Sequence, residues 1–200
     1  MNTKSFNIKS IFFSVFVLVI TTATAQSTTW KVDKSHSALS FAVDHMVISE
    51  TTGQFNDYEI TAIASKKDFT DAVFNVTIQT ASIDTKDAKR DGHLKSPDFF
   101  DVKKYPTITF KSKKFKKLSG KKYVLEGEFM MQGVTKKVAF DVKFGGVVKD
   151  PWGNTRMGMK LIGEVNRYDY NLKYNSALEA GGLMIGKTVT IECRVELVKQ

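Results

Sequence analysis

Hydrophobic and polar residues alternate with a period of two along most of the chain. In residues 72–80, for example, polar residues separate Phe74, Val76 and Ile78. Such alternation predicts antiparallel strands that bury one face. Eight runs of this kind cover residues 30–45, 53–64, 72–80, 107–115, 123–131, 136–144, 155–165 and 187–198. Eight consecutive strands favour an all-β fold, an eight-stranded antiparallel up-and-down barrel.

The connections between these runs carry further turn signals. Gln132-Gly133 predicts a two-residue hairpin turn. The alternation changes phase between Phe55 and Tyr58, which indicates a β-bulge. The connection over residues 166–186 is rich in Asn, Tyr and Gly and predicts an irregular loop.

The connection between the third and fourth runs, residues 84–105, is too long for a hairpin. Asp84 or Thr85 is a candidate helix cap, and a polar segment follows it. Gly92 or Ser96-Pro97 would end a helix that starts there. We therefore predict one short helix between strands three and four.

The first 25 residues have the composition of a secretory signal peptide. Lys4 and Lys9 precede an apolar run over residues 11–20, and the segment ends at Ala23-Thr24-Ala25. This run is about half of the roughly 20 residues that a membrane-spanning helix needs, and the small residues at its end suit signal peptidase. We expect cleavage near Ala25, one domain over residues 26–200, and a periplasmic or secreted location.

The composition of the whole chain is that of one globular domain without disulfides. The chain is 42% hydrophobic and 26% charged, which excludes intrinsic disorder and collagen-like repeats. Cys193 has no second cysteine to pair with, so we interpret it as a small buried side chain. A domain of about 175 residues buries enough surface to fold without cross-links.

The inward positions of the eight runs are large and apolar. A barrel of eight strands is just wide enough to be filled by its own side chains or to hold one small ligand, and both alternatives are open. The strand lengths imply a barrel roughly 25 to 30 Å tall, which favours an extended guest, and Gly127 and Gly163 are expected to leave room inside. The residues expected to line the interior are Leu39, Phe41, Phe74, Phe110, Phe129, Phe140, Phe144, Met157 and Met159.

A series of short motifs runs through residues 29–197. In chain order, they are Trp30-x-x-Asp33-x-x-His36-Ser37, Gly53-x-Phe55, Ser82-Ile83-x-Thr85, Arg90-Asp91-x-His93-Leu94-x-Ser96-x-x-Phe99-Phe100-Asp101, Tyr105-Pro106-x-Ile108-x-Phe110-x-Ser112, Gly133-Val134-Thr135 and Asn166-Arg167-x-Asp169-Tyr170. Together they resemble the YceI-like domain family. One departure is Asn171, where the family usually has Gly; Asn tolerates a left-handed backbone, so we expect the turn to be kept.

The resemblance implies an exported bacterial protein whose lipocalin-like barrel encloses a polyisoprenoid. We therefore expect a carrier, monomeric or homodimeric, that binds a polyisoprenoid, an isoprenoid-quinone-like lipid or a similar long-chain fatty lipid. The resemblance implies no catalytic mechanism, and the expected lipid is a ligand, so no cofactor is predicted. His36, His45 and His93 are expected to join the first strand to the 84–105 connection by hydrogen bonds, and His45 and His93 are also candidates for contact with a lipid headgroup.

Two alternatives remain beside a lipid carrier. One is a ligand-free envelope stress or interaction module with a packed barrel. The other is a metalloprotein or hydrolase that uses His36, His45 and His93. Their spacing matches no compact metal motif, and no nucleophile elbow surrounds Ser37 or Ser82, so we predict neither metal ligands nor catalytic residues.

Charged residues gather in the long loops and in one hairpin. Arg90, Asp91, Arg167 and Asp169 are candidates for ion pairs that pin the two long loops. Between Lys111 and Lys122, seven lysines in twelve residues mark either a solvated turn or a contact with an anionic membrane, at about 1 kcal/mol per lysine. No stacking platform accompanies the charge, so nucleic acid is not an expected partner.

Overall fold

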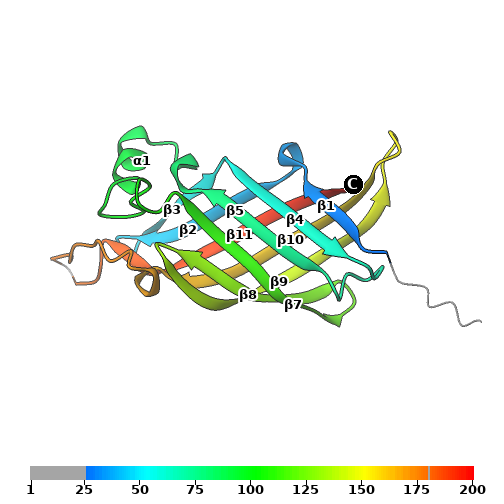
Figure 1. Ribbon diagram of the computed structural model, residues 1–200. Coiled ribbons are helices and arrows are strands. Elements are labelled where there is room, and N and C mark those ends of the chain that lie inside the picture. Colours follow the sequence, from blue (N-terminus) through cyan, green and yellow to red (C-terminus); the bar gives the residue numbers. More distant parts are fainter. Residues whose placement is uncertain (1–25, 180) are drawn as a thin grey trace, which may run out of the picture.

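A closed antiparallel barrel is the dominant feature of the computed structural model, which describes residues 26–179 and 181–200 (Figure 1). The predicted signal peptide, residues 1–25, lies outside the described residues. No helix in the described ranges is long and apolar enough to cross a membrane. The elements are β1 (Thr28–Val32), β2 (Ala38–His45), β3 (Ser49–Phe55), β4 (Tyr58–Ala64), β5 (Val73–Gln79), β6 (Ile83–Asp84), α1 (Ala88–Leu94), β7 (Thr107–Ser119), β8 (Lys122–Met131), β9 (Val134–Lys149), β10 (Thr155–Asn166) and β11 (Ile185–Lys199).

Eight strands form the barrel in the order β1-β4-β5-β7-β8-β9-β10-β11. The barrel closes where β1 pairs with β11, with Trp30 opposite Lys199 and Val32 opposite Leu197. The predicted eight-stranded antiparallel barrel is therefore confirmed. Strands β2 and β3 are further parts of the first two predicted runs. Strand β2 pairs with β11 and with β3, and β3 ends against the two-residue strand β6.

The first two predicted strands are each interrupted, which is a correction to the continuous runs expected. A 3₁₀ helix at Lys34–His36 separates β1 from β2, because the Asp33 side chain accepts a hydrogen bond from the Ser35 N–H and caps the turn. Between Phe55 and Tyr58 the expected bulge is a break between β3 and β4. There the Asn56 N–H donates to the Ser82 carbonyl, outside the barrel ladder.

Turn chemistry explains most of the remaining connections. Gln132 and Gly133 form the predicted hairpin turn, with φ angles of 49° and 72°. Helix α1 lies in the predicted connection, but its cap is Asp87, whose side chain accepts hydrogen bonds from the Lys89 and Arg90 N–H groups. The expected caps were wrong by two or three residues, because Asp84 instead accepts from the Lys86 N–H.

The predicted irregular loop after β10 is present and begins with a 3₁₀ helix, Arg167–Tyr170. Asn171 then adopts the left-handed conformation expected of it, with φ of 64°. Apart from an isolated bridge between Ala177 and Leu183, the described residues of this connection stay irregular up to β11.

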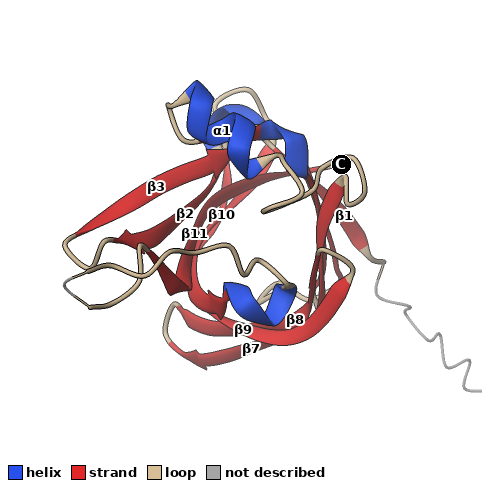
Figure 2. Ribbon diagram, turned by 90° about the vertical axis from the view of Figure 1, so that its left-hand side faces the viewer, coloured by secondary structure: helices blue, strands red, loops and turns tan. Residues whose placement is uncertain are grey.

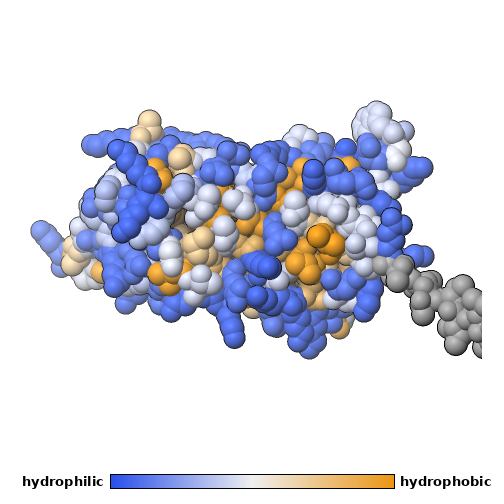
Figure 3. All heavy atoms as spheres, viewed as in Figure 1, coloured by the Kyte–Doolittle hydropathy of each residue, from blue (hydrophilic) through white to orange (hydrophobic). Residues whose placement is uncertain are grey.

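The connections divide between two ends of the barrel. Segments 46–48, 80–106, 132–133, 167–179 and 181–184 lie at one end, which we call the cavity end; it is on the left in Figure 1 and faces the viewer in Figure 2. Segments 65–72, 120–121 and 150–154 lie at the opposite end, which we call the packed end. Hydrophilic residues cover most of the side seen in Figure 3, with smaller hydrophobic areas between them.

Candidate functional site

A cavity of about 320 Å³ occupies the barrel at the cavity end. Its wall is largely apolar and comes from strands β2, β8 and β11 and from the two long connections. Asp44, Arg90 and Tyr174 belong to the wall and are exposed to solvent, so the cavity reaches the protein surface beside them. A concave apolar site with a few polar groups at its rim is the usual form of a small-molecule site.

The structure places five of the eleven residues expected at the ligand on this wall. They are Leu39, Phe41, His45, His93 and Phe129. The other six are buried at the packed end and do not line the cavity: Phe74, Phe110, Phe140, Phe144, Met157 and Met159. These six residues were expected to line the interior beside a guest; in the structure they belong to the hydrophobic core.

Side chains fill the packed end because aromatic rings occupy the space beside two glycines. A Cβ atom on Gly127 would lie 2.5 Å from Phe110 Cζ, and one on Gly163 would lie 2.6 Å from Phe140 Cδ1. The Phe110 and Phe140 rings meet edge to face, with their centroids 5.7 Å apart. The room that these glycines were expected to leave for a guest is therefore taken by protein.

Several wall residues were missed by the sequence analysis. Val43 on β2 and Val189, Ile191 and Cys193 on β11 occupy inward positions of predicted strands, so the alternation itself held the signal. The long connections add Leu94, Phe99, Phe100, Leu172, Tyr174 and Met184 to the wall. Nothing in the spacing of these loop residues indicates where they lie.

Cys193 lines the cavity and also packs against the hydrophobic core. It is half-buried, and the surrounding apolar side chains desolvate the thiol. This burial raises the pKa of Cys193 to about 12. The thiol is therefore a neutral, weakly polar part of the wall at neutral pH.

Arg167 organises the loop that closes one side of the cavity. The side chain is 3% exposed and donates hydrogen bonds to the carbonyls of Leu172, Tyr174, Ile185 and Gly186, at 2.5 to 3.3 Å. Burial lowers the pKa of its guanidinium. Within the described ranges no carboxylate lies within ion-pair distance of Arg167, so the ion pair expected for this residue is replaced by bonds to backbone carbonyls.

Arg90 and Asp91 hold the other long connection, and no ion pair joins them to the described residues of the second loop. The Arg90 Nε–H donates to Thr85 Oγ1 at 2.8 Å, and the Thr85 hydroxyl donates to Asp91 Oδ1 at 2.6 Å. Asp91 also accepts a bond from the Thr85 N–H at 2.9 Å. Thr85 is buried, so these three residues fix the segment that leads from β6 into α1.

The three histidines do not form one cluster. His45 and His93 lie on the cavity wall, whereas His36 is in the 3₁₀ helix between β1 and β2. His93 Nε2 lies 2.9 Å from Asp98 Oδ2, and its ring packs edge-on against Phe99 and Tyr174. Among the described residues neither Ser37 nor Ser82 hydrogen-bonds to His93, so these residues form no serine–histidine pair of the kind a hydrolase uses.

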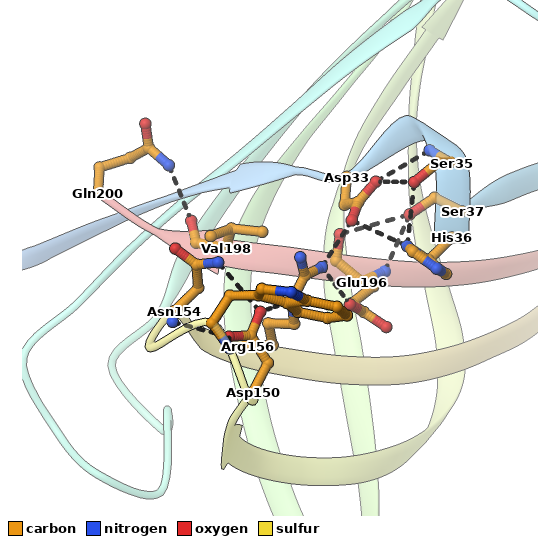
Figure 4. A network of polar contacts seen from close by, with 11 residues as sticks. Asp33, Ser35, His36, Ser37, Asp150, Asn154, Arg156, Glu196, Val198 and Gln200 are labelled. Carbon is orange, nitrogen blue, oxygen red and sulfur yellow. Dashed lines mark hydrogen bonds and ion pairs between the residues drawn. The ribbon is translucent and has the colours of Figure 1, made fainter.

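A polar network lies outside the cavity, where β1, β10 and β11 meet (Figure 4). Arg156 Nη1 lies 2.6 Å from both Asp33 Oδ2 and Glu196 Oε1. Arg156 Nε lies 2.6 Å from Asp150 Oδ2. Hydrogen bonds from Ser35 and Arg156 hold the pKa of Asp33 well below its usual range. Hydrogen bonding to Arg156 lowers the pKa of Asp150 to about 2.

One group of possible metal ligands occurs among the described residues, and it belongs to this network. Asp33, His36 and Glu196 have ligand atoms within 4.8 Å of one another. Arg156 already bonds both carboxylates, and His36 Nδ1 lies 2.9 Å from Asp33 Oδ2. The arrangement is that of an ion-pair network that joins three strands.

Comparisons with known proteins agree with this architecture. The YceI-like domain model matches residues 30–197. A UPF0312 protein from Staphylococcus aureus strain MSSA476 is 36% identical over 170 residues, which cover 84% of this chain and 96% of that protein. The Campylobacter jejuni YCEI protein is 30% identical, with a TM-score of 0.68 over 78% of this chain and 90% of that chain.

Two more distant crystal structures share the fold. Burkholderia cenocepacia BcnA is 21% identical, with a TM-score of 0.70 over 82% of this chain and 98% of its own. A polyisoprenoid binding domain from Saccharophagus degradans is 15% identical, with a TM-score of 0.63 over 86% of this chain and 98% of its own. The domain match and the Staphylococcus relative together show that this chain belongs to the YceI-like family.

Proposed function

We propose that this protein is an exported carrier that encloses the apolar tail of a long-chain lipid in its barrel. The observation that carries the proposal is the apolar cavity of about 320 Å³, which reaches the surface at one end and stops against a packed core at the other. The function follows from burial of the lipid in the protein and involves no bond chemistry.

The energetics favour a tail of several isoprenoid units. Burial of one five-carbon unit contributes roughly 3 to 4 kcal/mol, at about 0.8 kcal/mol per carbon. Association itself costs about 4 to 15 kcal/mol, so one unit is not enough. Because the packed end is filled by Phe110, Phe140 and their neighbours, the buried part of the tail is confined to the cavity end.

Family membership supports the choice of an isoprenoid. One protein with this fold is described as a polyisoprenoid binding domain. A polyisoprenoid or an isoprenoid-quinone-like lipid has the methyl-branched tail that the leucine, isoleucine, valine and phenylalanine side chains of the wall suit. The proposed carrier acts in the periplasm or outside the cell, after removal of the predicted signal peptide, as a monomer or homodimer.

The polar rim supports a headgroup site next to the tail. His45, Thr51 and His93 lie on the wall together with the exposed Asp44 and Arg90. A neutral imidazole can donate one hydrogen bond and accept another, so His45 and His93 suit a hydroxyl or carbonyl headgroup. These groups bind a headgroup in the proposed function; they perform no catalysis.

The test is to extract lipid from the purified protein and to identify it by mass spectrometry. We expect a long-chain isoprenoid in near-stoichiometric amount. The variant Val189→Phe, which fills the wall on β11, should reduce the bound lipid, whereas the surface variant Val148→Phe should not. A protein that is reproducibly empty and takes up no added lipid would overturn the proposal in favour of a ligand-free interaction module.

A further inference from the structure

The turn between β2 and β3 exposes three consecutive apolar side chains. Met46 is 39% exposed, Val47 is 73% exposed and Ile48 is 84% exposed. We call Met46–Ile48 the apolar tip. Hairpin turns usually carry Asn, Asp or Gly, which suit solvent and left-handed backbone. The composition of the apolar tip is therefore opposite to that expected of a solvated turn.

The backbone of the apolar tip is held in an unusual conformation. Met46 and Val47 have φ angles of 55° and 66°, a region that β-branched residues such as valine rarely adopt. The Met46 N–H donates to the Met184 carbonyl at 2.8 Å. Val47 packs against Gly182 so closely that a Cβ atom added to this glycine would lie 3.1 Å from Val47 Cγ2. The neighbouring loop thus supports a turn that directs its side chains outward.

The apolar tip is continuous with the cavity wall. Val43, Asp44 and His45, which directly precede it on β2, all line the cavity, as does Met184, which bonds it. Leu178 and Leu183 of the adjacent loop are half-buried. A contiguous exposed apolar patch of this kind marks an interaction site, and this one borders the cavity.

The cavity end carries less net charge than the lysine-rich segment 111–122. The segments that form the cavity end contain eight basic and seven acidic residues. Residues 111–122 contain seven lysines and no acidic residue, but their turn at Gly120 lies at the packed end. A membrane contact through these lysines would direct the cavity away from the bilayer. A nearly neutral surface with exposed apolar side chains suits the interface of a zwitterionic bilayer, which carries no net charge.

We propose that the apolar tip inserts into the headgroup region of a zwitterionic lipid bilayer, so that the cavity faces the membrane from which its ligand comes. This inference rests on the proposed function and adds the surface through which lipid is exchanged. Insertion is driven by apolar burial, so ionic strength has little effect on it.

Flotation of the purified protein with phosphatidylcholine vesicles tests the inference. We expect the protein to float with the vesicles equally at low and high salt. The double variant Val47→Ser, Ile48→Ser should weaken the partitioning by roughly tenfold or more, because two aliphatic side chains no longer insert. The matched control, Val148→Ser, changes a valine that is 64% exposed at the opposite end and should partition like the parent protein.

A second variant keeps the test independent of the folding of the apolar tip. Ile48→Trp retains an apolar residue and adds a fluorophore whose emission should shift to shorter wavelength with vesicles and be quenched by brominated lipid. Binding that needs phosphatidylglycerol and is lost in Lys116→Gln, Lys117→Gln would overturn the inference. So would the absence of vesicle binding, or ultracentrifugation showing that the tip joins two copies of the chain.

Lipid content separates this inference from the proposed function. The double tip variant should still contain lipid when purified, because its cavity wall is unchanged. Normal lipid content without vesicle binding would refute the docking surface and leave the carrier function standing. Vesicle binding by a protein that never contains lipid would refute the carrier function.

Discussion

The two ends of the barrel are built from the same strands and the same alternation, yet one is hollow and the other is solid. On β11, Val189, Ile191 and Cys193 line the cavity, whereas Val195 and Leu197 are buried in the packed end. Strands β7, β8 and β10 show the same transition, with Ile108, Phe129 and Val165 on the wall and Phe115, Leu125 and Met157 in the core. An inward position therefore does not by itself say whether a side chain faces a guest or another side chain.

The difference between the ends depends on what stands opposite each inward residue. At the packed end, Phe74 and Phe115 meet with centroids 5.2 Å apart, and Phe115 stacks on Tyr123 at 4.7 Å. At the cavity end the ladder is interrupted, because β3 pairs with β2 and β6 while β5 pairs with β4 and β7. Loops complete the wall there, and their side chains leave the centre unfilled.

Truncation of an aromatic ring should have the largest effect, and the effect should differ between the ends. Phe115→Ala removes a ring that is 2% exposed and should destabilise the protein by about 3 to 5 kcal/mol, because a new void opens in a packed region. Phe41→Ala enlarges a cavity that already exists, so it should lower the free energy of unfolding by less than half as much. Urea denaturation measures both. Equal losses would show that the cavity end is as tightly packed as the other end.

Enlargement of a valine should give the next largest difference. Val142 on β9 is 3% exposed at the packed end, so Val142→Phe should cost about 1 to 3 kcal/mol through overpacking. Val189→Phe places the same extra volume in the cavity and should cost less than about 1 kcal/mol. Thermal unfolding of the lipid-free forms compares the two. A larger loss for Val189→Phe would contradict the division of the barrel.

Arg167 should control the local stability of the cavity end. Arg167→Met removes one donor from four carbonyls, of which the one on Leu172 is buried, and should lower the free energy of opening of the 171–184 loop by about 1 to 3 kcal/mol. Hydrogen exchange should show the loss in this loop, with little change at the packed end. Arg194→Met is the control, because that side chain is 71% exposed. Uniform loss of protection would mean that Arg167 supports the whole barrel.

Acid should reveal the smallest contribution, from the ion-pair network around Arg156. Unfolded aspartates have a pKa near 3.8, whereas the pKa of Asp150 is about 2 in the folded protein and that of Asp33 is also lowered. The unfolded chain therefore takes up protons first, so this stabilisation is present above about pH 4 and is lost as the pH falls towards 2. The urea midpoint, measured at pH 7, 4 and 2.5, should fall less steeply with decreasing pH in Arg156→Met than in the parent protein. An unchanged slope would contradict this role.

The strand pattern was predictable because alternation reports burial locally. Runs such as 123–131 agree with β8 to within one residue, and Asn171 adopts the backbone expected of it. The breaks at Lys34–His36 and after Phe55 were not predicted, because each depends on a local polar contact: the Asp33 cap in one case and the bond of Asn56 to Ser82 in the other. The cap of α1 was misplaced for a similar reason, since three aspartates compete within a few residues.

By itself, the sequence determined the family, the antiparallel barrel and the apolar character of its interior, because these depend on patterns that recur along the chain. Only the tertiary structure decided where the interior is hollow. Gly127 and Gly163 suggest space in the sequence, but the rings of Phe110 and Phe140 occupy it. Whether a glycine leaves a cavity depends on the side chain that reaches across from another strand, and that distance is set only when the barrel closes.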